Sequence, residues 1–527
     1  MENRRNTYWI PIVMAMSMAV GLYTGNVLTP QSDSIMTSGE ERYQKIQDII
    51  HILDQRYVDS LDGQALFEKT IGDMLHSLDP HSNYIPAEEL KAMNESIEGK
   101  FGGVGVRFFI IRDTVCVTNV IANSPAMIAG LKSGDKIIKV DGKLIAGKNV
   151  TNEDLMAMLK GSEGTEVNVT IKRGDKLMKK RVVRGTIPVE SVTAAYMLTS
   201  DVGYIRIEQF SVVTADEFRA AAEKLRKKGL KKMVLDIRNN GGGVLTGATE
   251  IADEFLGANV PIVETRGEHS VPYTYRATSK GSLKDVELVI LINSNSASAS
   301  EILAGAIQDN DRGTIIGRRS FGKGLVQEDF ALRDGSNLRL TIARYYTPTG
   351  RCIQKPYTDD FNAYYEDQMD RYDNGEMFKV DSSLFVDSLK FVTPKGKVVY
   401  GGGGIMPDVF VPFDSVGSSW YYTELRYSSA FNTFAFDYIQ NKRGKWKSPK
   451  DFNQKFKVTD ALLKRFAEFA FKEHGVKQNE KDLATSKALI SRILKAEIAR
   501  QMWVEQGYYE VYNTDDVDVQ KAIKHLR

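Results

Sequence analysis

Four serines lie close together in residues 293–301 (NSNSASASE), between an apolar run and an amphipathic run. A serine at a strand-to-helix turn exposes its hydroxyl above the sheet, and the unpaired N–H groups at the helix start carry a partial positive charge. These features favour a nucleophile beside an oxyanion hole. Ser298 and Glu301 also have the spacing of a helix capping box, which alone would explain both residues.

A nucleophilic serine needs a base, and Lys323 is the best candidate in this sequence. All six histidines lie outside the turns that carry these motifs. Lys323 stands between two glycines after an apolar run, and it can act as a base only if burial lowers its pKa. Gln327 lies four residues further on. In an extended strand the two side chains share a face, so the amide oxygen of Gln327 could orient the amine.

Residues 317–324 also resemble a phosphate-binding loop, with the pattern G-x-x-x-x-G-K. Gly324 stands where a serine or threonine should bind magnesium, and a β-type pattern follows instead of a helix. The sequence therefore disfavours nucleotide binding, and the chemistry proposed for Ser298 and Lys323 needs neither a metal nor a nucleotide cofactor.

Residues 235–243 (LDIRNNGGG) place three glycines after another apolar run. Their N–H groups could form an anion-binding turn. The spacing is not that of a dinucleotide-binding loop, so a contribution to an oxyanion hole suits this turn better.

His76 lies at the end of a predicted helix, just before the segment 78–84 (LDPHSNY), and His81 lies within that segment. No acidic or cysteine partner lies at metal-ligand spacing from them. We interpret both histidines as polar residues of a helix end and a turn.

Strand and helix patterns alternate from about residue 188 onward. Three strand patterns are each followed by a helix pattern, at 202–207 and 215–229, 232–237 and 246–257, and 286–293 and 300–309. This alternation predicts an α/β core with buried, largely parallel strands. Two later β-type runs, 325–332 and 337–347, are separated by a short turn and predict a hairpin.

The regions around this core have other patterns. Residues 96–187 carry short β-type runs with one helical pattern at 152–161, whereas 41–95 and 418–527 are helical. Residues 355–385 are acidic and tyrosine-rich, which indicates an inserted surface segment. The fold class is therefore a multidomain α/β protein: an α/β core, an inserted β-rich domain, and helical N- and C-terminal regions.

The composition is that of an ordinary globular protein. A chain of 527 residues exceeds what one hydrophobic core usually holds. Its 70 basic and 68 acidic residues nearly balance, which gives no reason to expect a nucleic-acid partner. The two cysteines, Cys116 and Cys352, form neither a disulfide framework nor a zinc-ligand pattern.

The N-terminus predicts export. Arg4 and Arg5 precede an apolar run at 8–22, and no charged residue occurs from 7 to 32. This pattern is typical of a signal peptide or signal anchor over residues 1–30. We see no well-placed cleavage site after it, so we favour an uncleaved anchor in the inner membrane, with the rest of the chain in the cell envelope or periplasm.

Six segments together resemble the carboxyl-terminal processing, or tail-specific, serine proteases: 78–84, 235–243, 296–309, 321–327, 345–351 and 400–408. They occur in the family's order, and the resemblance covers about residues 40–410. The resemblance implies the following roles: nucleophile for Ser298, general base for Lys323, orienting partner for Gln327, and oxyanion hole for Ala299, Gly241 and Gly242.

A PDZ domain is part of the same resemblance. Residues 124–142 are similar to the turn, helix and strand at the centre of such domains. The carboxylate-binding loop would consist of Phe101, Gly102, Gly103, Val104, Gly105 and Val106. Its N–H groups would receive a terminal carboxylate while the tail adds a strand to the sheet edge.

The sequence thus predicts an exported serine endopeptidase whose substrates are proteins with apolar C-terminal tails. The expected domains are the signal segment 1–30, a helical region 41–95, the PDZ domain 96–187, the protease core 188–354, an insertion and return to the core 355–417, and a helical region 418–527. The family's helical ends also suggest a homodimer. Two rivals are a catalytically silent PDZ scaffold and an acyl hydrolase of a small amide or ester.

Overall fold

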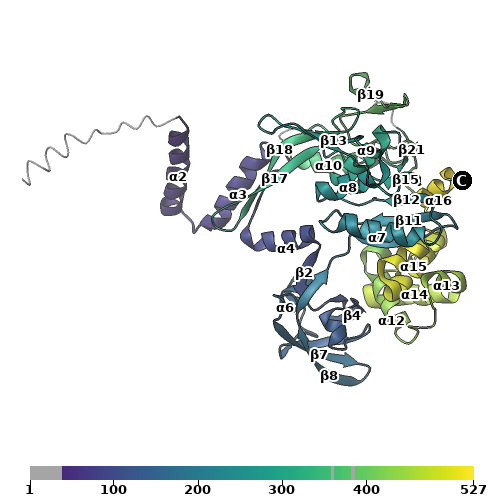
Figure 1. The fold of residues 1–527 in the computed structure, drawn as a ribbon. Helices are drawn as coiled ribbons and strands as arrows, with labels where there is room; N and C mark the ends of the chain where they lie inside the picture. The colour runs from purple at the N-terminus through teal and green to yellow at the C-terminus, as the bar shows by residue number, and fades with distance from the viewer. Residues whose placement is uncertain (1–37, 358–360, 381–385) are drawn as a thin grey trace, which may run out of the picture. The chain divides into compact units, whose positions relative to one another are not determined.

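The computed structural model describes residues 38–357, 361–380 and 386–527 (Figure 1). The chain divides into two compact units, residues 1–74 and residues 75–527. The signal anchor predicted for residues 1–30 lies outside the described residues. Within the ranges that are described, we find no helix with the length and apolar character that a membrane span requires.

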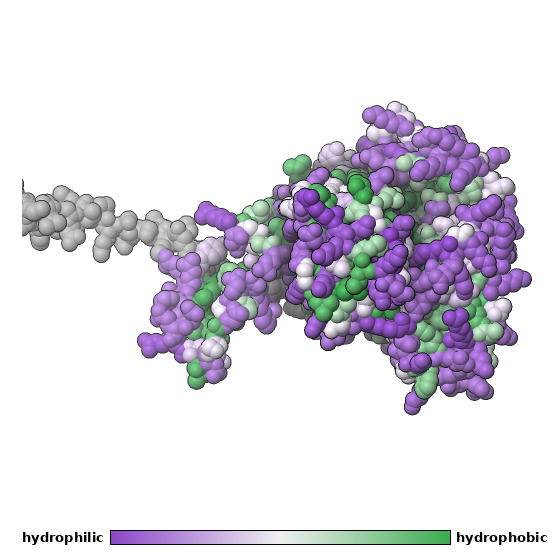
Figure 2. All heavy atoms as spheres, turned by 90° about the horizontal axis from the view of Figure 1, so that it is seen from below, coloured by the Kyte–Doolittle hydropathy of each residue, from purple (hydrophilic) through white to green (hydrophobic). Residues whose placement is uncertain are grey.

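The first unit contains helix α2 (Ser38–Arg56) and most of helix α3 (Gly63–His76). Its apolar side chains face solvent: Ile46 is 51% exposed and Ile49 is 50% exposed. Figure 2 shows hydrophobic side chains on the surface of this segment, next to the grey trace. The predicted helices are therefore present, and the described residues of this unit leave apolar side chains of α2 exposed.

A six-stranded sheet lies at the centre of the second unit, in the order β10-β11-β12-β15-β16-β21. Its strands are β10 (Val192–Met197), β11 (Val202–Ile207), β12 (Lys232–Asp236), β15 (Glu287–Ile292), β16 (Thr314–Gly317) and β21 (Val409–Phe410). Neighbours from β11 to β21 are parallel, and β10 pairs with β11 antiparallel at one edge. The predicted α/β core with largely parallel strands is confirmed.

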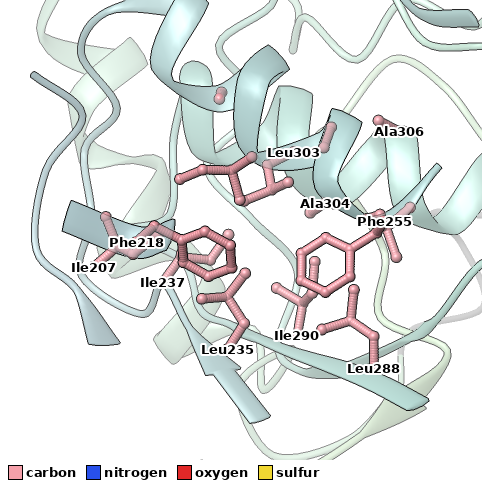
Figure 3. Close-up of a cluster of buried hydrophobic side chains, with 14 of the residues drawn as sticks. Ile207, Phe218, Leu235, Ile237, Phe255, Leu288, Ile290, Leu303, Ala304 and Ala306 are labelled. Carbon is pink, nitrogen blue, oxygen red and sulfur yellow. The ribbon is translucent and has the colours of Figure 1, made fainter. Parts of the chain in front are cut away.

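Both faces of this sheet are buried. Successive side chains of each strand point to opposite sides, and apolar residues occupy both. On one face, Leu235 and Ile290 pack beneath Phe218, Phe255 and Leu303 (Figure 3). These three come from the helices α7 (Thr214–Arg226), α8 (Leu245–Phe255) and α9 (Ala299–Asp309). On the other face, residues such as Val234 and Val289 pack with the C-terminal helix α16 (Val517–His525).

A second sheet brings the segment after α3 next to the strand that follows Lys323. Strands β17 (Leu325–Ala331) and β18 (Asn337–Tyr346) form the predicted hairpin, and β18 also pairs with β1 (Asn83–Ile85) and β13 (Pro261–Arg266). Strand β14 (Tyr273–Arg276) completes the sheet beside β13. The turn before β1 is thereby held close to Gln327 on β17.

The β-rich domain follows helix α4 (Ala87–Glu98). Strand β2 (Lys100–Gly103) pairs with β9 (Gly185–Pro188), and a separate six-stranded sheet begins at β3. That sheet contains β3 (Val106–Ile111), β4 (Thr114–Val120), β5 (Lys136–Val140), β6 (Lys143–Leu144), β7 (Glu166–Arg173) and β8 (Lys176–Val183). Two short helices, α5 (Pro125–Ile128) and α6 (Asn152–Leu159), accompany the sheet. Among the strands of the described residues, β3 pairs only with β4, which places it at an edge of this sheet.

The region 355–385 contains helix α10 (Phe361–Asp373), and two short strands follow it, β19 (Lys390–Val392) and β20 (Val398–Tyr400). Most residues of this helix are exposed, as expected of a surface segment, but two of its side chains are buried. Tyr364 is only 4% exposed and Arg371 only 1%, because both side chains pack into the core.

The C-terminal helical region is as predicted. Its helices are α11 (Trp420–Tyr427), α12 (Ala430–Ile439), α13 (Pro449–Lys455), α14 (Asp460–His474) and α15 (Glu480–Tyr512). They enclose an apolar cluster of their own, rich in phenylalanine, in which Phe431, Phe434 and Phe466 are in ring contact. These helices therefore have an apolar core of their own beside that of the α/β sheet, within the same compact unit.

Candidate active site

Ser298 lies at the turn between β15 and α9, directly before the first residue of the helix. Its backbone has φ 55° and ψ −114°, a conformation that residues with a side chain rarely adopt. Such strain persists only where the surroundings enforce it, and it is concentrated at functional sites. The turn therefore holds Ser298 at the helix start, where the N–H of Ala299 lies in the positive end of the helix dipole.

The glycine turn after β12 packs directly against this serine. A Cβ on Gly242 would lie 2.8 Å from the Cβ of Ser298 and 2.8 Å from the carbonyl oxygen of Ala297. Asn240 joins the two turns, because its carbonyl oxygen accepts the N–H of Ala297 at 3.0 Å and the hydroxyl of Ser300 at 2.9 Å.

This packing changes the expected role of Gly242. Its N–H donates to Oδ1 of Asn240 at 2.9 Å, so in this structure that N–H is engaged and does not point into an oxyanion hole. Gly241 and Ala299 do line the cavity that contains Ser298. Gly242 is needed here for its lack of a side chain rather than for its N–H.

Glu301 connects the serine turn to the lysine loop. Its buried carboxylate accepts the N–H groups of Ser298 at 2.8 Å, Gly322 at 2.7 Å and Lys323 at 2.9 Å, together with the hydroxyl of Ser320 at 2.5 Å. Burial raises its pKa, whereas the four donors favour the charged form. The sequence indicated Glu301 only as a helix cap, and its bonds to the lysine loop could not be inferred from local spacing.

Lys323 lies two residues before β17, and its amine donates to Oε1 of Gln327 at 2.8 Å. Burial, together with the positive charge of Arg339, lowers the pKa of this amine from 10.5 to about 8. The hydroxyl of Tyr345 contacts the carbonyl oxygen of Lys323 and lies 3.1 Å from that of Ser298. Strand β17 follows the loop that carries Lys323, whereas a phosphate-binding loop is followed by a helix.

Gln327 is held in turn by the segment before β1. Its Nε2 donates to the carbonyl oxygen of His81 at 2.5 Å, and the ring of His81 lies 2.9 Å from the hydroxyl of Tyr364. Burial lowers the pKa of His81 to about 3, and the charge of Lys323 adds to this effect, so the ring is neutral. Our interpretation of His81 as an ordinary turn residue missed these contacts, which join parts of the chain more than 240 residues apart.

His76, in contrast, matches that interpretation. Its ring nitrogen lies 3.1 Å from the side-chain oxygen of Asn83, at the exposed end of α3. No group of three potential ligands that could hold a metal ion occurs in residues 38–357, 361–380 and 386–527.

Ser298, Lys323 and Gln327 line one cavity of about 590 Å³. Apolar side chains of Ile97, Leu245 and other residues contribute to its wall. The cavity thus combines a serine at a helix start, an amine whose pKa lies near neutrality, and an apolar wall. These groups suit the attack of a hydroxyl on a carbonyl group.

The expected tail-binding loop is shorter than predicted. Phe101, Gly102 and Gly103 belong to β2 and pair with β9, so they do not form an open loop. The turn proper consists of Val104 and Gly105, whose φ of 83° requires the freedom of glycine. Val106 then begins β3, the edge strand beside which a further strand could pair.

Three family models match parts of this chain. Peptidase family S41 matches residues 201–363, a PDZ domain matches residues 102–182, and a family of unknown function matches residues 421–504. These ranges correspond to the α/β core, the β-rich domain and the C-terminal helices.

Known proteins are similar to large parts of this chain. A carboxy-terminal-processing protease of Bartonella bacilliformis is 40% identical over 345 residues, which are 63% of this chain and 78% of the relative. A probable CtpA-like serine protease of Staphylococcus aureus is 36% identical over 311 residues, which are 59% of this chain and 62% of the relative. The solved photosystem II D1 C-terminal processing protease is 26% identical, with a TM-score of 0.34, and the match covers 69% of this chain and 86% of that protein.

Proposed function

This chain belongs to peptidase family S41, as do the carboxy-terminal-processing proteases, and from that premise we propose that it cleaves proteins near their C-termini with a Ser298–Lys323 dyad. The observation that carries the proposal is the buried amine of Lys323, held by Gln327 in the same cavity as Ser298. A buried amine with a lowered pKa is what a lysine base needs.

In the proposed acylation, the proton of the Ser298 hydroxyl passes through Lys323 to the leaving amine, and a C–O bond to Ser298 replaces the C–N bond of the peptide. The hydroxyl oxygen of Ser298 attacks the peptide carbonyl carbon while the neutral amine of Lys323 takes the hydroxyl proton. The carbonyl oxygen becomes an oxyanion near the N–H of Ala299 at the start of α9. When the C–N bond breaks, Lys323 gives its proton to the leaving amine, and an acyl-enzyme remains on Ser298.

Hydrolysis of the acyl-enzyme repeats this exchange with water. Lys323 accepts a proton from the attacking water molecule, and the ester bond to Ser298 then breaks. The serine oxygen takes the proton back, so the enzyme returns to its starting state with the new carboxylate released. Gln327 keeps the amine directed toward the serine during both steps, because its side-chain oxygen accepts one amine hydrogen.

The PDZ domain is proposed to select the substrate. An apolar C-terminal tail would add as a strand beside β3, with its carboxylate at the turn of Val104 and Gly105. Edge strands offer unpaired backbone groups for this kind of pairing, and β3 is at a sheet edge.

Two further parts of the proposal concern location and assembly. The basic and apolar N-terminus would export the chain and anchor it in the inner membrane. The uncovered apolar side chains of α2, including Ile46 and Ile49, would suit pairing with a second copy of the chain in a homodimer.

Peptide mapping of a digest tests the proposal. A long, unstructured polypeptide with an apolar C-terminus is incubated with the wild type or with Ser298→Ala, and new termini are identified by mass spectrometry. New internal termini should appear only with the wild type. Equal cleavage by Ser298→Ala would contradict the proposal. Cleavage of small esters with no cleavage of polypeptides would instead favour an acyl hydrolase, and a folded wild type with neither activity would favour a PDZ scaffold.

A further inference from the structure

Helix α10 lies in the segment inserted between the core strand β18 and the strand pair β19 and β20. Its side chains reach three separate loops of the candidate active site. We propose that α10 is a positioning element for the proposed reaction, and that Arg371 on this helix fixes the loop that carries Lys323. This inference rests on the proposed function of Ser298 and Lys323.

The first contact is with the lysine loop. The guanidinium of Arg371 donates to the carbonyl oxygen of Ser320 at 2.8 Å and to that of Phe321 at 3.1 Å. Asp367 balances the charge at 2.8 Å from the guanidinium. A buried guanidinium is costly unless it is paired, and Nη1 and Nη2 of Arg371 donate to the backbone just before Lys323.

The second contact is with the serine turn. Nε2 of Gln368, one helical turn before Arg371, donates to Oδ1 of Asn295 at 2.7 Å and to the carbonyl oxygen of Ser294 at 3.3 Å. Gln368 thus binds the turn that leads to Ser298. One rigid helix thereby fixes the distance between the two loops that carry the proposed nucleophile and base.

The third contact is with the group that holds Gln327. The hydroxyl of Tyr364 lies 2.9 Å from the ring of His81 and accepts Nε2 of Gln354 at 3.2 Å. Oε1 of Gln354 in turn accepts the N–H of Gly324, the residue after Lys323, at 2.8 Å. Tyr364 therefore contacts His81, which holds Gln327. It also accepts a hydrogen bond from Gln354, which holds the lysine loop.

Lys355, at the start of the inserted segment, contacts both the lysine loop and helix α10. Its amine lies 4.2 Å from the ring centre of Phe321 and 4.1 Å from that of Tyr364, and donates to the carbonyl oxygen of Tyr364 at 2.7 Å. Glu376, just after α10, binds Arg319 through two bonds of 2.6 Å and 2.7 Å. A segment with only a surface role would not need such a set of buried polar contacts.

The test compares Arg371→Lys and Arg371→Met with a matched control, Glu366→Ala, on the exposed side of the same helix. The variants are made in the full chain, and thermal unfolding first establishes that each is folded. Both Arg371 variants should lower kcat by about tenfold or more with KM within about threefold, because a misplaced base affects the chemical step more than binding. Glu366→Ala should match the wild type.

A pH profile separates positioning from general loss of structure. If the loop around Lys323 loosens, its amine becomes more hydrated, so the midpoint of the single-turnover acylation rate should rise from near 8 toward higher pH. A partly unfolded population would lower the amplitude without moving the midpoint. Arg371→Lys should recover part of the rate lost in Arg371→Met, because it retains one charged donor.

Folded Arg371 variants with wild-type kcat and an unchanged midpoint would overturn the inference. If neither variant folds, Tyr364→Phe and Gln368→Ala replace them, since each removes only one set of hydrogen bonds. Wild-type kcat and an unchanged midpoint of the acylation rate in both of these variants would equally overturn the inference. Ser298→Ala is measured alongside. If that variant cleaves normally, the proposed function fails, whereas fully active Arg371 variants beside an inactive Ser298→Ala refute only the role of α10.

Discussion

Oε2 of Glu301 accepts the N–H of Lys323 at 2.9 Å, and the same oxygen accepts the N–H of Ser298 at 2.8 Å. The proposed nucleophile and base are therefore held by one atom of a third residue. The arrangement fixes the backbone of both residues without engaging their side chains.

Glu301→Gln tests this connection. A glutamine has one acceptor oxygen where the carboxylate has two, so at least one buried donor loses its partner, at a cost of about 1–3 kcal/mol. We expect a lower unfolding temperature and a fall in kcat of about tenfold or more, because both backbones shift. Circular dichroism melting and steady-state kinetics measure the two effects. A variant with wild-type kcat would show that this carboxylate has no positioning role.

Gly242→Ala tests the close packing against Ser298. A Cβ at this position would lie 2.8 Å from the carbonyl oxygen of Ala297, and φ of 103° is unfavourable for alanine. Gly241→Ala is the matched control, because a Cβ there meets no atom within 4 Å. We expect Gly242→Ala to lose activity and stability while Gly241→Ala retains its stability. Equal behaviour of the two variants in kinetics and melting would count against the packing argument.

Gln327→Glu tests the partner of the amine. A carboxylate beside the amine favours its protonated form, so the pKa of Lys323 should rise from about 8 toward its ordinary value of 10.5. Fewer amines are then neutral at a given pH, and the rate of acylation should reach its midpoint at higher pH. Glu328→Gln changes a charge on the next, exposed residue and should leave the midpoint unchanged. An unmoved midpoint in Gln327→Glu would remove Gln327 from the proposed site.

Substrate selection is tested with paired peptides that differ only at the C-terminus. A peptide with apolar final residues and a free carboxylate should bind the full chain with the Ser298→Ala substitution more tightly than its C-terminal amide, since hydrogen bonds to a charged group are stronger. Isothermal titration measures both affinities. Equal affinities would leave the protease proposal intact but would contradict recognition of a terminal carboxylate.

Much of the fold could be predicted from the sequence because its signals are local. The strands predicted at 202–207 and 337–347 agree with the observed bounds to within one residue, since their apolar runs and turn residues are close together in the chain. Five of the six residues expected at the protease site, all except Gly242, also line one cavity. Their roles could be assigned only through the resemblance, because four serines of the same turn have equivalent local chemistry.

The parts that could not be predicted depend on contacts distant in sequence. His81 and Gln327 are 246 residues apart, so the importance of the 79–82 turn appears only when β1 pairs with β18. The acidic and tyrosine-rich composition predicted a surface segment, and most of α10 is exposed, but Arg371 is buried. A composition average cannot indicate that a single arginine pairs with backbone carbonyl groups of another loop.

The pH dependence of single-turnover acylation tests the central claim that Lys323 is the base for Ser298. The wild type is mixed in excess with a chromogenic acyl substrate between pH 6 and 10, and the acylation rate is compared with that of Lys323→Ala. The wild-type rate should rise with pH to a plateau, with a midpoint near 8, since the neutral amine is the reactive form. Lys323→Ala should be folded but show no acylation above background. If Lys323→Ala instead acylates at a rate close to that of the wild type with the same midpoint, Lys323 is not the base.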